Sequence, residues 1–125
     1  MENKVNDLIN AERAKAGCGK LRADARLHKA ARDYSALMAA KNFFSHTSPD
    51  GSDFVDRIAA AGYPRDAAAA ENIAYGYADA AAVVKGWMGS SGHRANILNC
   101  SLKAVGVGLA YRQSTPYWTQ DFGRA

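Results

Sequence analysis

Large and small side chains alternate near the end of the chain, and this pattern constrains the fold more than any other feature. Between residues 104 and 112 the alternating positions are Val105, Gly106, Val107, Gly108, Leu109, Ala110 and Tyr111. A period of two is typical of a β-strand, and a face of glycine and alanine lets a helix or a ligand approach the backbone closely. Residues 114–116 (Ser-Thr-Pro) predict a turn and residues 117–122 a returning strand, so we expect a β-hairpin here.

Helical spacing of apolar residues dominates the preceding part of the chain. It predicts five helices, over residues 2–16, over 24–41, from a start after Asp50 or Ser52 to residue 61, over 79–88 and over 91–98. Asp24 and Asp79 are the expected N-caps of the second and fourth helices. An additional strand is predicted over residues 71–77. Helices first, then a strand, a helix and a hairpin predict an α+β fold with helices packed on a small antiparallel sheet.

Length and composition favour one soluble domain over residues 1–125. No apolar run approaches the roughly 18 residues of a membrane-spanning helix. The net charge is +4, and most Lys and Arg residues lie before residue 42, mixed with acidic residues. This mixture is typical of solvated helix faces, with weak attraction to an anionic surface as the alternative. Nucleic-acid binding is not expected, because the chain has no dense basic stripe.

Two features of the sequence leave the compartment open. The first residues contain no apolar segment of a secretory signal, which fits a cytosolic protein or the mature part of an exported one. Cys18 and Cys100 both stand beside turn residues. Taken alone, they are compatible with one disulfide in an oxidising compartment and with two free thiols.

Two of the three histidines follow predicted helices. His28 lies within a predicted helix and is expected to be solvated, whereas His46 and His93 lie among residues that favour exposure. His93 falls in the first turn of a predicted helix, where the helix dipole disfavours its charged form. With Glu71, the two rings would make a chemically sensible zinc ligand trio with one open position. Glu71 equally suits a structural hydrogen-bond acceptor or the ion-pair partner of an arginine.

Several segments, in this order, resemble the CAP superfamily of cysteine-rich secretory proteins, antigen 5 and pathogenesis-related-1 proteins. The similar segments are Leu8-Ile9-Asn10-Ala11-Glu12-Arg13, Ser45-His46, Glu71-Asn72-Ile73-Ala74, Trp87-Met88, Gly92-His93-Arg94-Ala95-Asn96-Ile97-Leu98, Gly106-Val107-Gly108 and Tyr117-Trp118-Thr119-Gln120. The form of the segment around His93 is that of the bacterial branch.

The resemblance implies a three-layer α-β-α sandwich with a cleft that contains His46, Glu71 and His93. Ser90 and Asn72 are further candidates for the cleft. Many family members carry two histidines and two glutamates there, and some bind zinc or another divalent metal. Ser90 stands where the second glutamate is usual, and a hydroxyl does not supply its charge.

Bacterial members are usually exported, which implies secretion and a Cys18–Cys100 disulfide. The resemblance then implies a monomeric extracellular binding module whose ligand is a lipid, a sterol or a cell-wall component. The alternative is a metal-dependent hydrolase, protease-like, that uses His46, Glu71 and His93.

Overall fold

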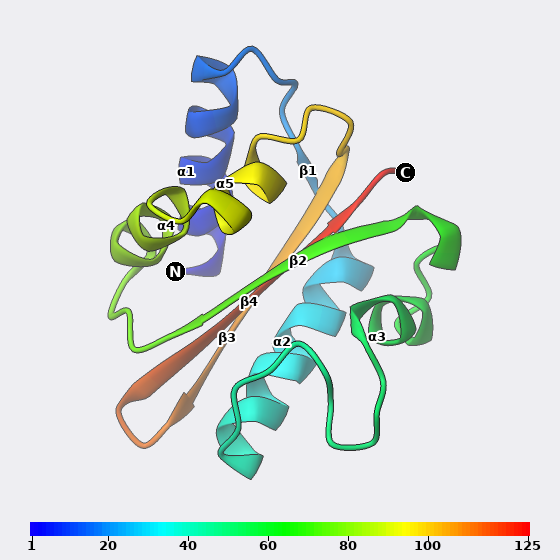
Figure 1. The fold of residues 1–125 in the computed structure, drawn as a ribbon, viewed down its shortest axis with the longest axis vertical. Coiled ribbons are helices and arrows are strands. Elements are labelled where there is room, and N and C mark those ends of the chain that lie inside the picture. Colours follow the sequence, from blue (N-terminus) through cyan, green and yellow to red (C-terminus); the bar gives the residue numbers. More distant parts are fainter.

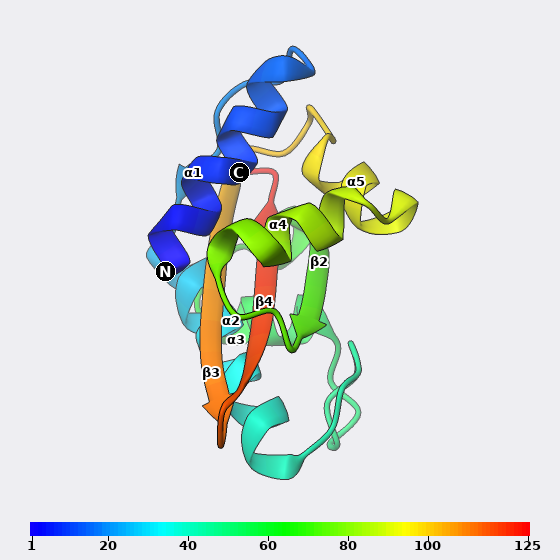
Figure 2. The same cartoon turned by 90° about the vertical axis from the view of Figure 1, so that its left-hand side faces the viewer.

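A four-stranded sheet lies between two layers of helices in the computed structural model, which describes residues 1–125 (Figure 1). One face carries α1 (Glu2–Lys15), α4 (Ala80–Met88) and α5 (Ser91–Ile97), and the other carries α2 (Ala25–Lys41) and α3 (Phe54–Ala60) (Figure 2). The strands are β1 (Arg22–Ala23), β2 (Ala68–Tyr75), β3 (Ala104–Arg112) and β4 (Thr115–Gly123), and a 3-10 turn covers Arg65–Ala67. The predicted α+β fold and the three-layer α-β-α sandwich are confirmed.

The strands follow the order β1-β3-β4-β2 across the sheet. β4 pairs antiparallel with both β3 and β2, as the predicted antiparallel sheet requires. The two-residue strand β1 pairs parallel with β3 and makes the sheet mixed, and it is too short to leave a periodic signal in the sequence. β2 begins three residues earlier than predicted, at Ala68, and ends at Tyr75.

The face of β3 that carries glycine and alanine packs against helix α2. This confirms the prediction that small residues let a helix approach the strand. A Cβ atom added at Gly106 would overlap the backbone of Leu27 and His28, and one at Gly108 would overlap that of Ala31 and Arg32. The predicted hairpin is also present. Its turn comes earlier than expected, because Gln113 adopts a φ of 54° and β4 already begins at Thr115.

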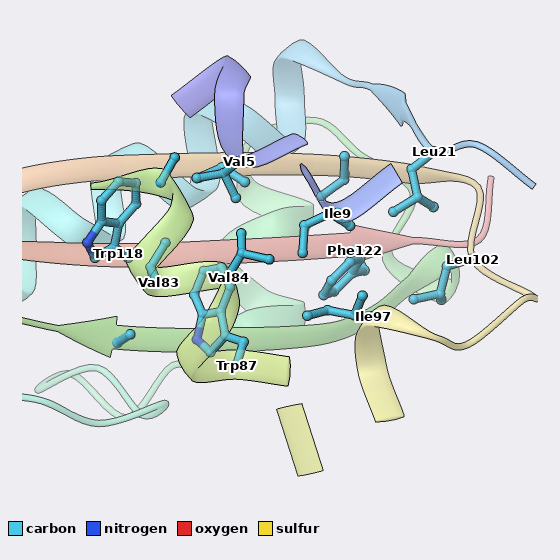
Figure 3. Packing of buried hydrophobic residues seen from close by; sticks show 14 residues of the cluster. Val5, Ile9, Leu21, Val83, Val84, Trp87, Ile97, Leu102, Trp118 and Phe122 are labelled. Carbon is cyan, nitrogen blue, oxygen red and sulfur yellow. The ribbon is translucent and has the colours of Figure 1, made fainter. Parts of the chain in front are cut away.

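The opposite face of the sheet buries the largest apolar cluster, which α1, α4 and α5 cover (Figure 3). Its labelled members are Val5, Ile9, Leu21, Val83, Val84, Trp87, Ile97, Leu102, Trp118 and Phe122. Both faces of β4 are therefore buried.

Aspartates start three helices by accepting hydrogen bonds from backbone N–H groups of the first turn. Asp24 accepts from two N–H groups of α2, and Asp79 accepts from one of α4, as predicted. Asp53 starts α3 and forms a capping box with Asp56.

A disulfide joins Cys18, just after α1, to Cys100, just after α5, as the family resemblance implied. Arg13 reinforces the same junction. Its side chain is buried and donates hydrogen bonds to the carbonyl oxygens of Gly19, Ile97, Asn99 and Leu102. None of the helices combines the length and the apolar character that a membrane span requires.

Candidate functional site

The candidate residues meet at β2, which lies at one edge of the sheet. His46 belongs to the loop between α2 and α3, Glu71 to β2 and His93 to α5. Two side chains close the outer edge of β2. The indole Nε1 of Trp87 donates to the carbonyl of Ile73 at 3.2 Å, and Asn96 Nδ2 donates to that of Glu71 at 3.4 Å. This covering removes acceptors that would otherwise pair with another strand.

Glu71 is held in an ion pair that the sequence alone left as one of several alternatives. Its side chain is only 1% exposed, and Arg57 of α3 is its partner. The Nη2 atom of Arg57 donates to both carboxylate oxygens. A buried carboxylate needs such compensation, because its desolvation is costly.

Arg57 also holds the loop that carries His46. Its Nη1 atom donates to the carbonyl of His46 at 3.0 Å and to the hydroxyl of Ser48 at 3.2 Å. The guanidinium lies over the ring of Tyr34, with 3.4 Å between its carbon and the ring centroid, and the Tyr34 hydroxyl donates to the carbonyl of Ser45. One cation therefore fixes α2, α3, β2 and the loop relative to one another. Nothing in the local sequence around Arg57 distinguished it from a solvated helix arginine.

His46 uses one ring nitrogen for the protein and leaves its ring half exposed. Nδ1 lies 3.0 Å from Glu71 Oε1, and 54% of the side chain is open to solvent. A carboxylate acceptor at Nδ1 places the proton there in the neutral ring, so Nε2 is the free acceptor. Glu71 thus orients His46.

His93 pairs with Ser90, which precedes α5. The ring Nδ1 lies 2.9 Å from the Ser90 hydroxyl. Burial lowers the pKa of His93, and the nearby charge of His46 lowers it further, so the neutral ring is favoured. The direction agrees with the sequence prediction, although the main cause is burial and not the helix dipole.

Asn72 lies beneath the site, because it points to the face of the sheet opposite Glu71. It is fully buried and receives a hydrogen bond from Asn96 at 2.9 Å. Its own amide donates to Gln120 at 3.1 Å and to the carbonyl of His93 at 3.3 Å. The structure therefore places Asn72 as a support for α5.

Asp121 is a buried acid at the site that the sequence patterns did not single out. It is directly opposite Glu71 in the β2–β4 register and has no exposed surface. No N–H or O–H group of the protein donates to either of its oxygens. Burial, followed by the charge of Glu71, raises the pKa of Asp121 well above its usual range.

The neighbouring Glu71 shifts in the opposite direction. Burial alone would raise its pKa, but His46, Asp121 and Arg57 outweigh this effect and lower it. A protonated Asp121 can donate to the Glu71 carboxylate, so the pair carries one negative charge against the positive charge of Arg57.

The geometry of Glu71 does not fit the role of a metal ligand. His46 and Arg57 already engage both of its oxygens, and its side chain is closed to solvent. The structure contains no group of three or more His, Cys, Asp or Glu side chains placed to hold a metal ion. The ring Nε2 atoms of His46 and His93 are the remaining candidate donors.

A groove of about 270 Å³ opens beside His93 and runs across the outer edge of β2. We call it the aromatic groove. Its lining residues are Phe44, Ile73, Ala74, Tyr75, Tyr77, Gly86, Trp87, Ser90 and His93. A larger hollow of about 490 Å³ lies apart from both histidines, between α1 and β1.

The three-layer sandwich, the loop histidine paired with a β2 glutamate and the second histidine on the short helix α5 together define a CAP-type domain. The model of the cysteine-rich secretory protein family (CAP) matches residues 7–122, and the chain belongs to this family.

Known relatives agree with this assignment. The chain is 45% identical over 121 residues to YkwD of Bacillus subtilis, a match that covers 97% of the chain and 46% of YkwD. It is 32% identical to an extracellular protein containing a SCP domain from Bacillus anthracis, with a TM-score of 0.90 over 99% of the chain and 40% of that protein. An outer surface protein from Borrelia burgdorferi shares the fold at 22% identity, with a TM-score of 0.85 over 95% of the chain and 88% of that protein. The chain thus spans less than half the length of its Bacillus relatives.

Proposed function

We propose that this chain is a secreted CAP domain that acts as an extracellular binding module. Two observations support secretion: the similar proteins include an extracellular one and an outer surface one, and the Cys18–Cys100 disulfide suits an oxidising compartment. The ligand belongs to the extracellular surroundings of the cell, as a cell-wall component, a lipid or a sterol.

We prefer binding over catalysis because hydrogen bonds within the protein already occupy both carboxylate oxygens of Glu71. A hydrolase at this site would use the carboxylate as a general base or as a metal ligand, and either role needs an oxygen open to the substrate or the metal. Both oxygens of Glu71 instead face Arg57 and His46 inside the protein. Such a buried network keeps the surface above it rigid. A rigid surface favours binding, because little conformational entropy is lost when the ligand binds.

The metal-dependent hydrolase is the alternative, and one observation favours it. His46 and His93 each have a ring nitrogen, Nε2, that makes no hydrogen bond to the protein, while both Nδ1 atoms are engaged. Zinc binds neutral imidazole nitrogens. A site with these two protein ligands would be weaker than a closed site of four.

The test of binding is co-sedimentation of the protein with purified bacterial cell walls and, separately, with liposomes with and without sterol. We expect the protein to sediment with at least one of these surfaces, and binding to lipid to survive the substitution His93→Ala. Failure to sediment with any of them would overturn the binding module.

A calorimetric zinc titration tests the alternative. Saturable binding near micromolar concentration that His46→Ala abolishes and His28→Ala leaves intact would support the metal site. His28 is the matched control, because it lies on α2 and contacts Glu2. An absence of heat with the wild type would remove the metal-dependent hydrolase.

A further inference from the structure

Aromatic side chains form a continuous, partly exposed surface at one end of the aromatic groove. Phe44 and Tyr75 are in contact, with 4.8 Å between their ring centroids, and keep exposed fractions of 45% and 54%. Tyr75 stacks on the buried Tyr117 at 5.7 Å, with 18° between the ring planes. These contacts hold the rings in place before any ligand arrives, so little side-chain entropy remains to be lost on binding.

The other end of the aromatic groove is polar. Ser90 and His93 line it, and no Lys, Arg, Asp or Glu side chain is among the lining residues. The Ser90 hydroxyl and the His93 imidazole offer hydrogen-bonding groups, and no Lys, Arg, Asp or Glu faces them, which suits a ligand with hydroxyl or amide groups and without a net charge.

The size of the aromatic groove further limits the classes of ligand that it suits. Its volume of about 270 Å³ falls just below the range of roughly 300–1,000 Å³ found for pockets that enclose drug-sized ligands. One six-membered ring with its substituents fits such a volume. A four-ring sterol nucleus or a long acyl chain would extend beyond it.

The closed edge of β2 argues against an extended peptide. A peptide that adds a strand needs free carbonyl groups along the edge. Trp87 and Asn96 already donate to the carbonyls of Ile73 and Glu71, and the Trp87 ring is buried beside the strand.

We propose that the aromatic groove is a subsite for one pyranose ring of a neutral glycan, packed on Phe44 and Tyr75 and hydrogen-bonded to Ser90 and His93. This inference rests on the proposed function, for which it names the ligand class. The C–H groups on one face of a pyranose are apolar and weakly positive, and they match the negative face of an aromatic ring. The hydroxyl groups at the rim of the sugar then meet the polar end of the groove.

The experiment is an NMR titration of the intact chain with a tetrasaccharide of N-acetylglucosamine. We expect saturable shifts of groove residues at millimolar concentration. Tyr75→Ala should weaken binding about tenfold, because it removes the stacking ring, and Tyr75→Phe should retain it. Tyr111→Ala is the matched control, since Tyr111 is 51% exposed but lies outside the groove.

The outcomes separate the glycan from the other ligands. An absence of shifts at about 10 mM saccharide, or equal weakening by Tyr75→Ala and Tyr111→Ala, would overturn the subsite. Saturable binding of polyproline peptide in its place would assign the groove to peptides. If the oligosaccharide fails while sedimentation with cell walls or liposomes persists, only the subsite is wrong; if both fail, the binding module is wrong as well.

Discussion

A single nitrogen of Arg57 serves both carboxylate oxygens of Glu71, at 2.8 Å from Oε1 and 2.7 Å from Oε2. The pair joins α3 to the edge strand β2, and the Nη1 atom of Arg57 donates to the carbonyl of His46. The position of His46 therefore depends on an interaction buried behind it.

Replacing Arg57 with methionine should be strongly destabilising. Met fills a similar volume but leaves the Glu71 carboxylate buried without a cation, and loss of one partner of a buried pair costs about 3–5 kcal/mol. Urea denaturation of the wild type and Arg57→Met measures the free energy of unfolding.

Arg65→Met is the matched control for this prediction. Arg65 also pairs with a carboxylate, that of Asp56 at 2.9 Å, but its side chain is 61% exposed. Exposed pairs contribute up to about 1 kcal/mol, so this loss should be small. The double variant Arg57→Met/Glu71→Gln should recover part of the stability, because it removes the unpaired charge. Equal losses in the two single variants would show that Glu71 does not depend on Arg57.

The stability of Asp121→Asn relative to the wild type should depend on pH. The pKa of Asp121 is raised in the folded protein, so above the ordinary value of 3.8 the unfolded chain loses this proton while the folded chain keeps it. In that window the unfolded state binds fewer protons, and this group makes the wild type less stable as pH rises. Asparagine removes the titration and stays neutral. The free energy of unfolding of the variant, relative to that of the wild type, should therefore rise by up to about 1.4 kcal/mol per pH unit, until pH reaches the folded pKa of Asp121.

Denaturation of both proteins at a series of pH values above 4 gives this difference directly. The pH dependence of stability that Glu71 contributes has the opposite sign. Its pKa is lowered in the folded protein, so its contribution to stability is lost as pH falls. It is present in both proteins, so its contribution largely cancels. A difference that stays flat with pH would show that Asp121 ionises as readily in the folded chain as in the unfolded one.

Loss of the Cys18–Cys100 disulfide should destabilise the chain by about 4.5 kcal/mol in the loop-entropy model, because 82 residues separate the two cysteines. Denaturation with and without reductant measures the effect, and intact mass after alkylation confirms the redox state. The Cys18→Ser/Cys100→Ser variant is the control, since reductant should not change it further. Arg13 would still tie the same segments together, so a loss below about 1 kcal/mol would mean that its hydrogen bonds suffice.

Local patterns predicted most of the fold. The helical period, the caps Asp24 and Asp79 and the alternation in β3 each act over a few residues, and the structure confirms them. The sequence did not predict β1, because two residues show no period. It also missed the start of β2, because the alanines of Ala68–Ala70 are typical of a helix.

The candidate site was predictable only in part. The family resemblance pointed to His46, Glu71 and His93, but no short-range pattern links Arg57 to Glu71 or Asp121 to either. These contacts arise when distant segments pack together. Asp121 is also hidden from pattern analysis because β4 is buried on both faces, so a polar residue there does not mark a solvent-facing position.

The close approach of α2 to β3 predicts that Gly108→Ala destabilises the fold. A methyl group there would meet the backbone of Ala31 and Arg32, which cannot move without lifting the whole helix. Such overpacking costs typically about 1–3 kcal/mol. Gly92→Ala is the matched control, because Gly92 lies within α5 with open space around it and should gain up to about 1 kcal/mol from helix propensity. The midpoint of urea denaturation should thus shift in opposite directions for the same chemical change. An unchanged midpoint for Gly108→Ala would mean that the packing of α2 does not require glycine on this face of β3.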